Sequence, residues 1–424
     1  MTFPTPAMAF PTLQVCPRDA KTLEVVAETQ VQNLIEQHHA FVNEHKECAD
    51  SKMWRRVRHR HGVRLFRERR RSAVKRERFE KSGSSIKTRK NNNRDVTPLL
   101  MLVGRIPGNL DDVMYGVMSP TTEAMKLQSS CVNDGLSDLA VLASIIMPSQ
   151  SDPFRELSIK WAVKRHALNP LRRTRDLVYM ESIGFTTTPS GERIGYQVKH
   201  SVDLPGAQPL NDLGIVRAHL SFCYVYRQRS ENVVDVFMKG TISSLGDTFT
   251  NFACSSTAAD IALAVVKTPY CSQMKKLAWV LKTGKQTTPA PSSHVLFPSK
   301  SCAVCAQNVP SVRSPREAYR NTCRICCERV CARCLVLKTM RCMTSLDDHR
   351  LVSTKMHFCT RCLRHANEEN AQNVALHDIL ADEGCRTQER ALDIIRKLRI
   401  DSISTCSLDE DFNFNSTSSL YYMQ

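Results

Sequence analysis

The cysteine spacing between residues 301 and 365 constrains the fold of this chain more than any other feature. Four Cys-x-x-Cys pairs occur there, and ten of the chain's 18 cysteines lie between residues 302 and 362. Two residues between thiolates allow a tight turn to direct both sulfurs at one ion, and tetrahedral zinc needs two such pairs. The spacing therefore predicts two zinc ions. The predicted ligands are Cys302, Cys305, Cys323, Cys326, Cys331, Cys334, Cys359 and Cys362.

Metal binding also explains how so short a segment could fold. No sustained amphipathic pattern occurs in it and charged residues are frequent, so core burial alone would hardly stabilise it and metal affinity would supply much of the folding free energy. A disulfide cluster is the alternative interpretation. A reducing compartment would keep the thiols free for metal.

Length and composition indicate a globular, intracellular protein. The chain has 424 residues, of which 42% are apolar, enough for two or three domains with a sizeable core. No run of 18 apolar residues appears, and residues 1–14 lack a basic stretch before an apolar one. The sequence therefore predicts neither a membrane span nor a secretory signal, and we expect a cytoplasmic protein.

One segment carries most of the formal charge of +17. Between Arg55 and Arg94 there are 17 Lys and Arg residues against 3 Glu, and residues 67–97 read as a basic insertion. Such a stretch is typical of a solvated insertion, of a patch that binds anionic membranes, or of a nuclear-import or nucleic-acid-binding patch. Few aromatic residues interleave the basic ones, which disfavours nucleic acid.

The order of patterns along the chain predicts an α+β domain before the cysteines. We expect a flexible N-terminus over residues 1–18, an amphipathic helix within 19–52, and a globular domain over 53–285. Within it, alternating apolar residues predict six or seven antiparallel strands, among them a hairpin around residues 188–191. A helical pattern follows over 247–282, with Pro269 as a kink or a break. A polar linker over 286–300 and short helices with a disordered tail over 366–424 complete the chain.

A curved antiparallel sheet with a long helix at its end has one economical arrangement. The sheet wraps around the helix and leaves an apolar tunnel between them.

Several irregular blocks resemble a known family. They begin at Val103 (Val-Gly-Arg-Ile-Pro-Gly), Thr187 (Thr-Thr-Pro-Ser-Gly-Glu-Arg-Ile-Gly-Tyr), His200 (His-Ser-Val-Asp-Leu-Pro-Gly) and Gln273 (Gln-Met-Lys-Lys-Leu-Ala-Trp). The chain is similar to oomycete proteins that join a START-like lipid-binding domain to a FYVE-type zinc finger. The resemblance implies a helix-grip fold for residues 53–285 with a hydrophobic cavity, and a cross-braced finger over 301–365.

The resemblance also implies how the cysteines pair. Cys302, Cys305, Cys331 and Cys334 would hold one zinc ion, and Cys323, Cys326, Cys359 and Cys362 the other. Cys327 stands where the family often has glycine, and we expect it to be a buried thiol. Cys342 and His357 are fallback ligands.

The finger departs from its family at the lipid-binding motif. Fingers that bind phosphatidylinositol 3-phosphate have an Arg-(Arg/Lys)-His-His-Cys-Arg motif, because cations must hold two phosphates. This chain has Arg320-Asn-Thr-Cys-Arg at that position, without either histidine. Arg320 and Arg324 remain candidates for contacting a lipid head group.

No arrangement typical of an active site appears in the sequence. There is no nucleophile elbow, no phosphate-binding glycine loop, and no open position at the predicted zinc sites. The sequence predicts a non-enzymatic adaptor that binds a phospholipid or another hydrophobic ligand, with phosphoinositide membranes, endosomal ones included, and proteins as further partners. The alternatives are a nucleic-acid-binding or nuclear protein that uses residues 55–94, and a ubiquitin-ligase-like finger.

Overall fold

The computed structural model describes residues 10, 13–82, 97–164, 174–244, 258–287, 301–309, 320–343 and 351–381. Residues Met1–Leu376 form one compact unit, and of the remainder only residues 377–381 are described, as helix. The predicted linker from residue 288 on, residues 83–96 of the basic insertion and the tail from residue 382 lie outside the described residues. None of the helices in the described part is long and apolar enough to span a membrane.

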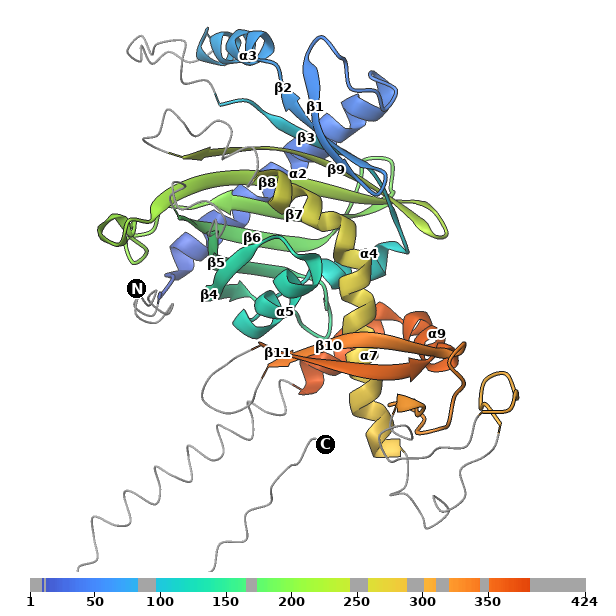
Figure 1. Ribbon diagram of the computed structural model, residues 1–424. Helices are drawn as coiled ribbons and strands as arrows, with labels where there is room; N and C mark the ends of the chain where they lie inside the picture. Colours follow the sequence, from blue (N-terminus) through green and yellow to red (C-terminus); the bar gives the residue numbers. More distant parts are fainter. Residues whose placement is uncertain are drawn as a thin grey trace, which may run out of the picture. The chain divides into compact units, whose positions relative to one another are not determined.

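A nine-stranded sheet forms the centre of the unit (Figure 1). Its order is β1-β2-β3-β9-β8-β7-β6-β5-β4, and neighbours in this order are antiparallel. The antiparallel α+β architecture is as predicted, but the number of strands is larger than the predicted six or seven. The strands are β1 Trp54–Arg60, β2 Val63–Glu68, β3 Leu100–Pro107, β4 Leu136–Ile146, β5 Glu156–Lys164, β6 Arg175–Thr187, β7 Arg193–Ser201, β8 Val216–Ser230 and β9 Val233–Ser244.

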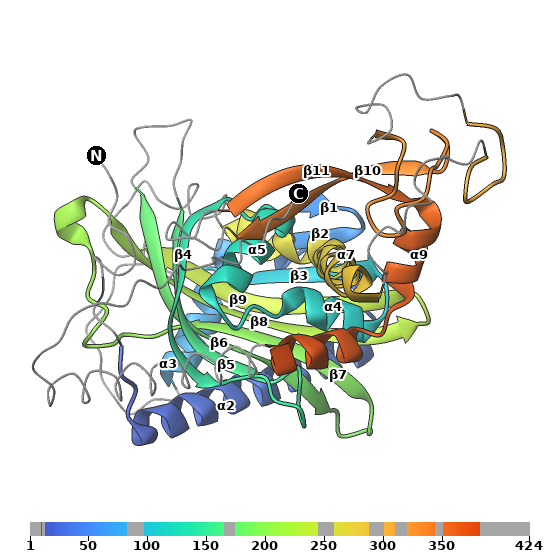
Figure 2. The ribbon, with the colours of Figure 1, turned by 90° about the horizontal axis from the view of Figure 1, so that it is seen from below.

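Helices cover both faces of this sheet. Figure 2 shows α2 on one face and α4, α5 and α7 on the other. The helices are α2 Pro17–Asn43, α3 Arg70–Ser82, α4 Leu110–Val117, α5 Thr122–Val132, α7 Thr268–Thr287 and α9 Thr360–Glu368. A separate hairpin of β10 Leu335–Met343 and β11 Leu351–Cys359 belongs to the cysteine-rich segment.

Strand β3 shows how the sequence builds two cores at once. Met101 and Val103 pack in the cluster that contains α2, whereas Leu102 and Ile106 pack in the cluster on the opposite face. Successive side chains of a strand point to opposite faces. A strand covered on both faces therefore reads as a continuous apolar run, as residues 99–103 do.

Local turn and cap chemistry fixes several boundaries. His61 and Gly62 have φ values of 44° and 81°, the two positive values that a two-residue hairpin turn of type I′ requires between β1 and β2. The side chain of Asn109 accepts a hydrogen bond of 2.7 Å from the Asp112 N–H and caps α4. A polar side chain at this position satisfies a backbone N–H that has no intrahelical acceptor.

Pro269 begins a helix instead of kinking one. Residues 258–263 are helical, a 3-10 turn spans Ala264–Lys267, and α7 starts at Thr268. Proline is tolerated in the first turn of a helix because the N–H that it lacks has no intrahelical acceptor there. The sequence predicts a kink or a break at Pro269, and the structure has the break.

Helix α7 packs against α4 at very short range. A Cβ atom on Gly116 would overlap the carbonyl oxygen of Thr268, so only glycine permits this approach. Lys275 donates hydrogen bonds of 2.7 and 2.8 Å to the carbonyl oxygens of Tyr115 and Met118, at the C-terminal end of α4. Orphan carbonyls and the helix dipole both favour a cation at that end.

A network of charged side chains lies in the interior between the sheet and the helices. Lys160 is fully buried, and its Nζ lies 2.6 Å from both Glu156 Oε1 and Glu181 Oε2 and 3.0 Å from Ser119 Oγ. Gln197 Nε2 donates a hydrogen bond of 2.6 Å to Glu181 Oε1. Buried charges persist only when they are paired and hydrogen-bonded, as these are.

The pairing controls protonation. Burial would raise the pKa of Glu181, but Lys160 and Lys199 outweigh it and bring the pKa to about 2. Burial likewise opposes the charge on Lys160, and Glu156 and Glu181 overcome it, so the pKa of Lys160 is raised. Lys160 and Glu181 are therefore both charged at neutral pH.

We expect Lys160→Met to destabilise the fold by about 3–5 kcal/mol, because it leaves two carboxylates buried without their cation. The free energy of unfolding in urea measures the loss. The matched control is Lys199→Met, since Lys199 also pairs with Glu181, at 3.3 Å, but is 19% exposed. If the two variants lost the same free energy of unfolding, the buried Lys160 would not stabilise the fold more than the partly exposed Lys199 does.

Candidate metal centres and ligand cavity

Two turns in the cysteine-rich segment have the same construction. The Cys302 N–H donates to Gln307 O at 2.8 Å, and the Cys323 N–H donates to Glu328 O at 3.0 Å. Each turn contains one residue in the left-handed region, Ala306 with φ 60° and Cys327 with φ 56°. The turns place Cys302 beside Cys305 and Cys323 beside Cys326.

The other two cysteine pairs sit at the ends of the β10–β11 hairpin. Cys331 and Cys334 precede β10, and the Cys334 N–H donates to Cys331 O at 3.0 Å. Cys359 ends β11 and caps α9, and its Sγ accepts a hydrogen bond of 3.3 Å from the Cys362 N–H. The Thr360 N–H, which donates to Cys334 O at 2.9 Å, ties the two ends together.

This arrangement gathers eight thiols into two groups of four. Cys302, Cys305, Cys331 and Cys334 form one group, and Cys323, Cys326, Cys359 and Cys362 form the other. Within each group the sulfur atoms lie within 4.8 Å of one another, so each group could hold a metal ion. The first and third pairs share one group, and the second and fourth share the other, which is a cross-braced arrangement.

The sulfur spacing fits zinc. Cys305 Sγ and Cys331 Sγ are 3.7 Å apart, and Cys326 Sγ and Cys359 Sγ are 4.0 Å apart. A tetrahedron with Zn–S bonds of about 2.3 Å has edges of about 3.8 Å. Four protein ligands per group would close the coordination sphere, which is typical of structural sites and leaves no position for an activated water.

One thiol in each group is poised to ionise. A hydrogen bond from the Cys326 thiol, aided by backbone N–H groups, lowers the pKa of Cys323 to about 4. Burial acts against ionisation of Cys302, but backbone hydrogen bonds from Cys331, Cys305 and Val304 bring its pKa to about 6. Backbone donors directed at the sulfurs are the environment that a thiolate ligand needs.

The remaining sequence candidates lie outside these groups. Cys327 is exposed, so the expectation of a buried thiol is wrong; its positive φ explains why a glycine would suit the position. Cys342 is exposed, and neither it nor His357 joins a group. Arg320 is exposed and Arg324 is half-buried.

The finger packs against α7. Met274, Leu277 and Val280 of α7 share an apolar cluster with finger residues that include Cys323 and Phe358. Lys276, 1% exposed, forms a salt bridge with Asp112 of α4 and donates a hydrogen bond of 3.2 Å to Asn367 O in α9. No sequence pattern indicated this role, since Lys276 follows Lys275 as two lysines exposed on a helix surface often do.

A small cavity lies between the sheet and the start of α7. Its volume is about 40 Å³, enough for about three water molecules. The lining combines apolar side chains such as Leu220 and Val265 with polar ones such as Gln197 and Lys199. The predicted apolar tunnel is thus present only as a small space with a mixed lining.

Among solved structures, this chain is similar to lipid-transfer domains. No family model and no curated protein matches the chain. The human StarD13 (DLC2) lipid transfer and protein localization domain is 15% identical, with 55% of this chain and 96% of that chain covered and a TM-score of 0.33. Human STARD10 is 12% identical, with coverages of 66% and 93% and a TM-score of 0.33. Human StAR-related lipid transfer protein 5 is 13% identical, with coverages of 57% and 98% and a TM-score of 0.34. Because these scores are low, we base the function on the residues of this chain.

We expect Cys326→Ser and its neighbour Cys327→Ser to differ in zinc content. Cys326 belongs to a group of four thiols and Cys327 belongs to none. Native mass spectrometry of the full chain should therefore show two zinc ions in wild type and in Cys327→Ser, and one in Cys326→Ser. Loss of zinc from both variants, or from neither, would contradict the assignment.

Proposed function

We propose that this chain is a non-enzymatic zinc-binding adaptor that binds a lipid or another hydrophobic ligand between its sheet and α7. The proposal includes a START-like, helix-grip role for the sheet domain and a FYVE-type role for the finger. The observation that carries it is the position of α7. The start of this helix lies next to a cavity under one face of the sheet, and Met274, Leu277 and Val280 further along it share an apolar cluster with members of both cysteine groups.

Ligand entry requires α7 and the 3-10 turn before it to move. Val265 and Thr268 line the cavity, and ligand sites for drug-sized molecules are about 300–1,000 Å³. A cavity of about 40 Å³ must therefore expand before it admits an acyl chain. The sheet strands are fixed by hydrogen bonds to both neighbours, so displacement of the helical side is the less costly route.

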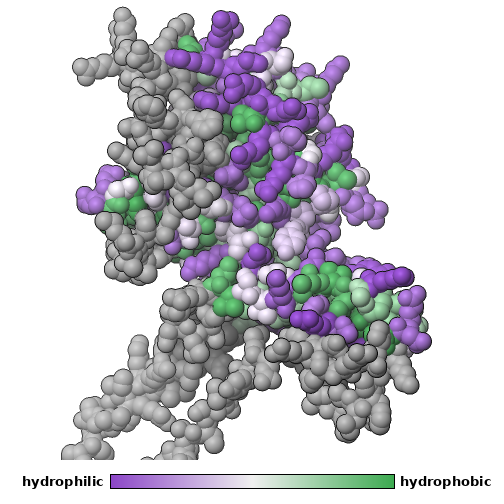
Figure 3. All heavy atoms as spheres, in the orientation of Figure 1, coloured by the Kyte–Doolittle hydropathy of each residue, from purple (hydrophilic) through white to green (hydrophobic). Residues whose placement is uncertain are grey.

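The finger supplies a surface suited to a membrane. Leu337 and Leu351, which share one face of the β10–β11 hairpin, are 50% and 36% exposed, and Figure 3 shows apolar residues over this region. Apolar side chains beside cations favour an anionic membrane interface. Arg320 is the proposed contact to a head-group phosphate. Arg324, which is half-buried, is a second and less accessible one.

We expect the purified full chain to retain one lipid-sized ligand in native mass spectrometry. Val265→Trp should abolish retention because the indole fills the cavity, whereas Val25→Trp, at an exposed position of α2, should leave it intact. Thermal unfolding checks that both variants fold. A wild-type protein that carries no ligand and extracts none from liposomes would remove the lipid-binding proposal.

A second experiment separates membrane binding from nucleic-acid binding. Strand β1 is an exposed edge, with Arg55, Arg56 and Arg58 at the surface, so the nucleic-acid alternative retains a structural basis. We expect flotation with liposomes that contain phosphatidylinositol 3-phosphate, reduced severalfold by Arg320→Ala. Binding to duplex DNA that weakens about tenfold or more between 50 and 200 mM salt, without flotation, would favour the alternative instead.

A further inference from the structure

A second hollow lies on the face of the sheet opposite α7. A groove of about 410 Å³ runs between the C-terminal end of α2 and strands β2, β3 and β9, compared with about 40 Å³ for the cavity under α7. Helix α2 packs on β7, β8 and β9. The end of α2 and the β1–β2 hairpin therefore form opposite walls above the sheet.

Strand register defines the floor of the groove. Arg64 of β2 is paired with Val103 of β3, which is paired with Phe237 of β9, so the three side chains form a row across one face. Phe41 of α2 stacks on Phe237 with ring centroids 5.0 Å apart. The row thus runs from an aromatic, apolar end at α2 to a guanidinium at the hairpin.

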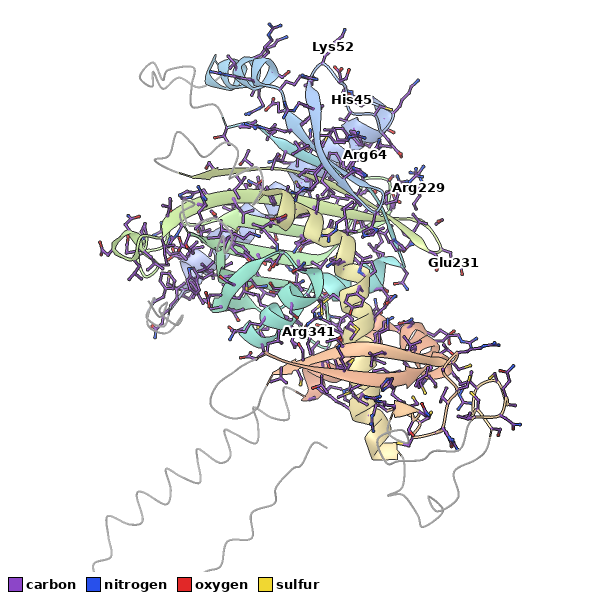
Figure 4. The ribbon with its side chains drawn as sticks, in the orientation of Figure 1. His45, Lys52, Arg64, Arg229, Glu231 and Arg341 are labelled. Atoms are coloured by element: carbon purple, nitrogen blue, oxygen red, sulfur yellow. The ribbon has the colours of Figure 1, made fainter. Side chains whose placement is uncertain are left out.

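The acidic residues of the groove are already paired. Asp235 lies 2.9 Å from Arg229 and 3.5 Å from Arg105, and Glu47 lies 3.0 Å from Arg229 and 3.9 Å from Arg105. These four residues balance in charge. Arg64 is exposed and makes no ion pair with any described residue; its guanidinium lies 6.0 Å above the Phe66 ring. Figure 4 labels Arg64 and Arg229 on the same flank of the molecule.

The charged residues that line the groove, Glu47, Arg64, Arg105 and Asp235, sum to zero, and Arg229 beside them makes the local charge positive. His38 also lines it, and burial, aided by the charge of Arg227, lowers the pKa of His38, so its ring is neutral at neutral pH. One uncompensated guanidinium at the end of an apolar floor favours an anion with an apolar body.

Size decides between a small ligand and a protein. The volume falls within the range of about 300–1,000 Å³ for small-molecule sites, whereas a stable protein interface buries about 800 Å² on each partner. We propose that this groove binds a small amphipathic carboxylate, with its apolar body on Phe41, Val103 and Phe237 and its carboxylate on Arg64. The site lies on the other face from the cavity under α7, so it does not depend on the function proposed above.

Titration calorimetry of the zinc-loaded full chain with decanoate tests the site. Arg64→Ala should weaken binding about tenfold or more, because a charge-assisted hydrogen bond is lost. The matched control is Arg55→Ala, which removes the same charge from the adjacent strand, at a position paired with Arg67 and away from the groove; it should change affinity by less than about twofold. Val42→Trp, at the α2 wall, should block binding.

The neutral analogue decanol separates the two parts of the ligand. It should bind wild type more weakly than decanoate does, and Arg64→Ala should not affect it. If Arg64→Ala and Arg55→Ala lowered the affinity for decanoate equally, the attraction would be non-specific and the proposed site would be wrong. Full affinity for decanoate in Val42→Trp would also rule the site out. Lipid retention by Val42→Trp in native mass spectrometry distinguishes failure of this groove from failure of the cavity under α7.

Discussion

The packing of α7 is the constraint on which the rest of the unit depends. Gly116 allows α4 to approach α7 so closely that Lys275 reaches the carbonyl oxygens at the end of α4. The next residue, Lys276, joins Asp112 on one side and Asn367 O on the other. A buried cation with two partners fixes the helix in direction and register, because loss of Asp112 would leave its charge unpaired and loss of the Asn367 carbonyl would remove a hydrogen bond.

The interior of the sheet domain is organised by charge as much as by apolar packing. Lys160, Glu156 and Glu181 occupy positions that face the helices, where a ligand-binding domain would be expected to leave space. A paired network of this kind rigidifies a core and favours one arrangement of it. The small cavity under α7 follows from this filling, so any larger ligand space has to come from the helical side.

The sequence predicts the structural features that depend on the spacing of nearby residues. It does not predict the contacts between residues that are distant in the chain. The four Cys-x-x-Cys pairs and the turn at residues 188–191 are local signals, and the structure places the thiols in two groups and β6 and β7 in a hairpin around that turn. Strand β4 gives a weak signal because three register shifts interrupt its pairing with β5. Strand β1 gives a weak signal because an exposed edge strand needs no apolar face. The partners of Lys160 lie on β5 and β6, and a single charged residue in a strand gives no sign of what it meets across the sheet.

The shared helix also couples the two proposed activities energetically. Val265 and Thr268 line the cavity just before and at the start of α7, and Met274, Leu277 and Val280 hold the same helix to the finger. If ligand entry moves α7, the finger has to move with it or give up these contacts, and either outcome changes the free energy of the finger. Linkage is reciprocal, so whatever binds the finger changes ligand affinity by the same factor. If metal bound by the two cysteine groups stabilises the finger, metal binding also helps to set how readily the cavity opens, because the finger contacts α7.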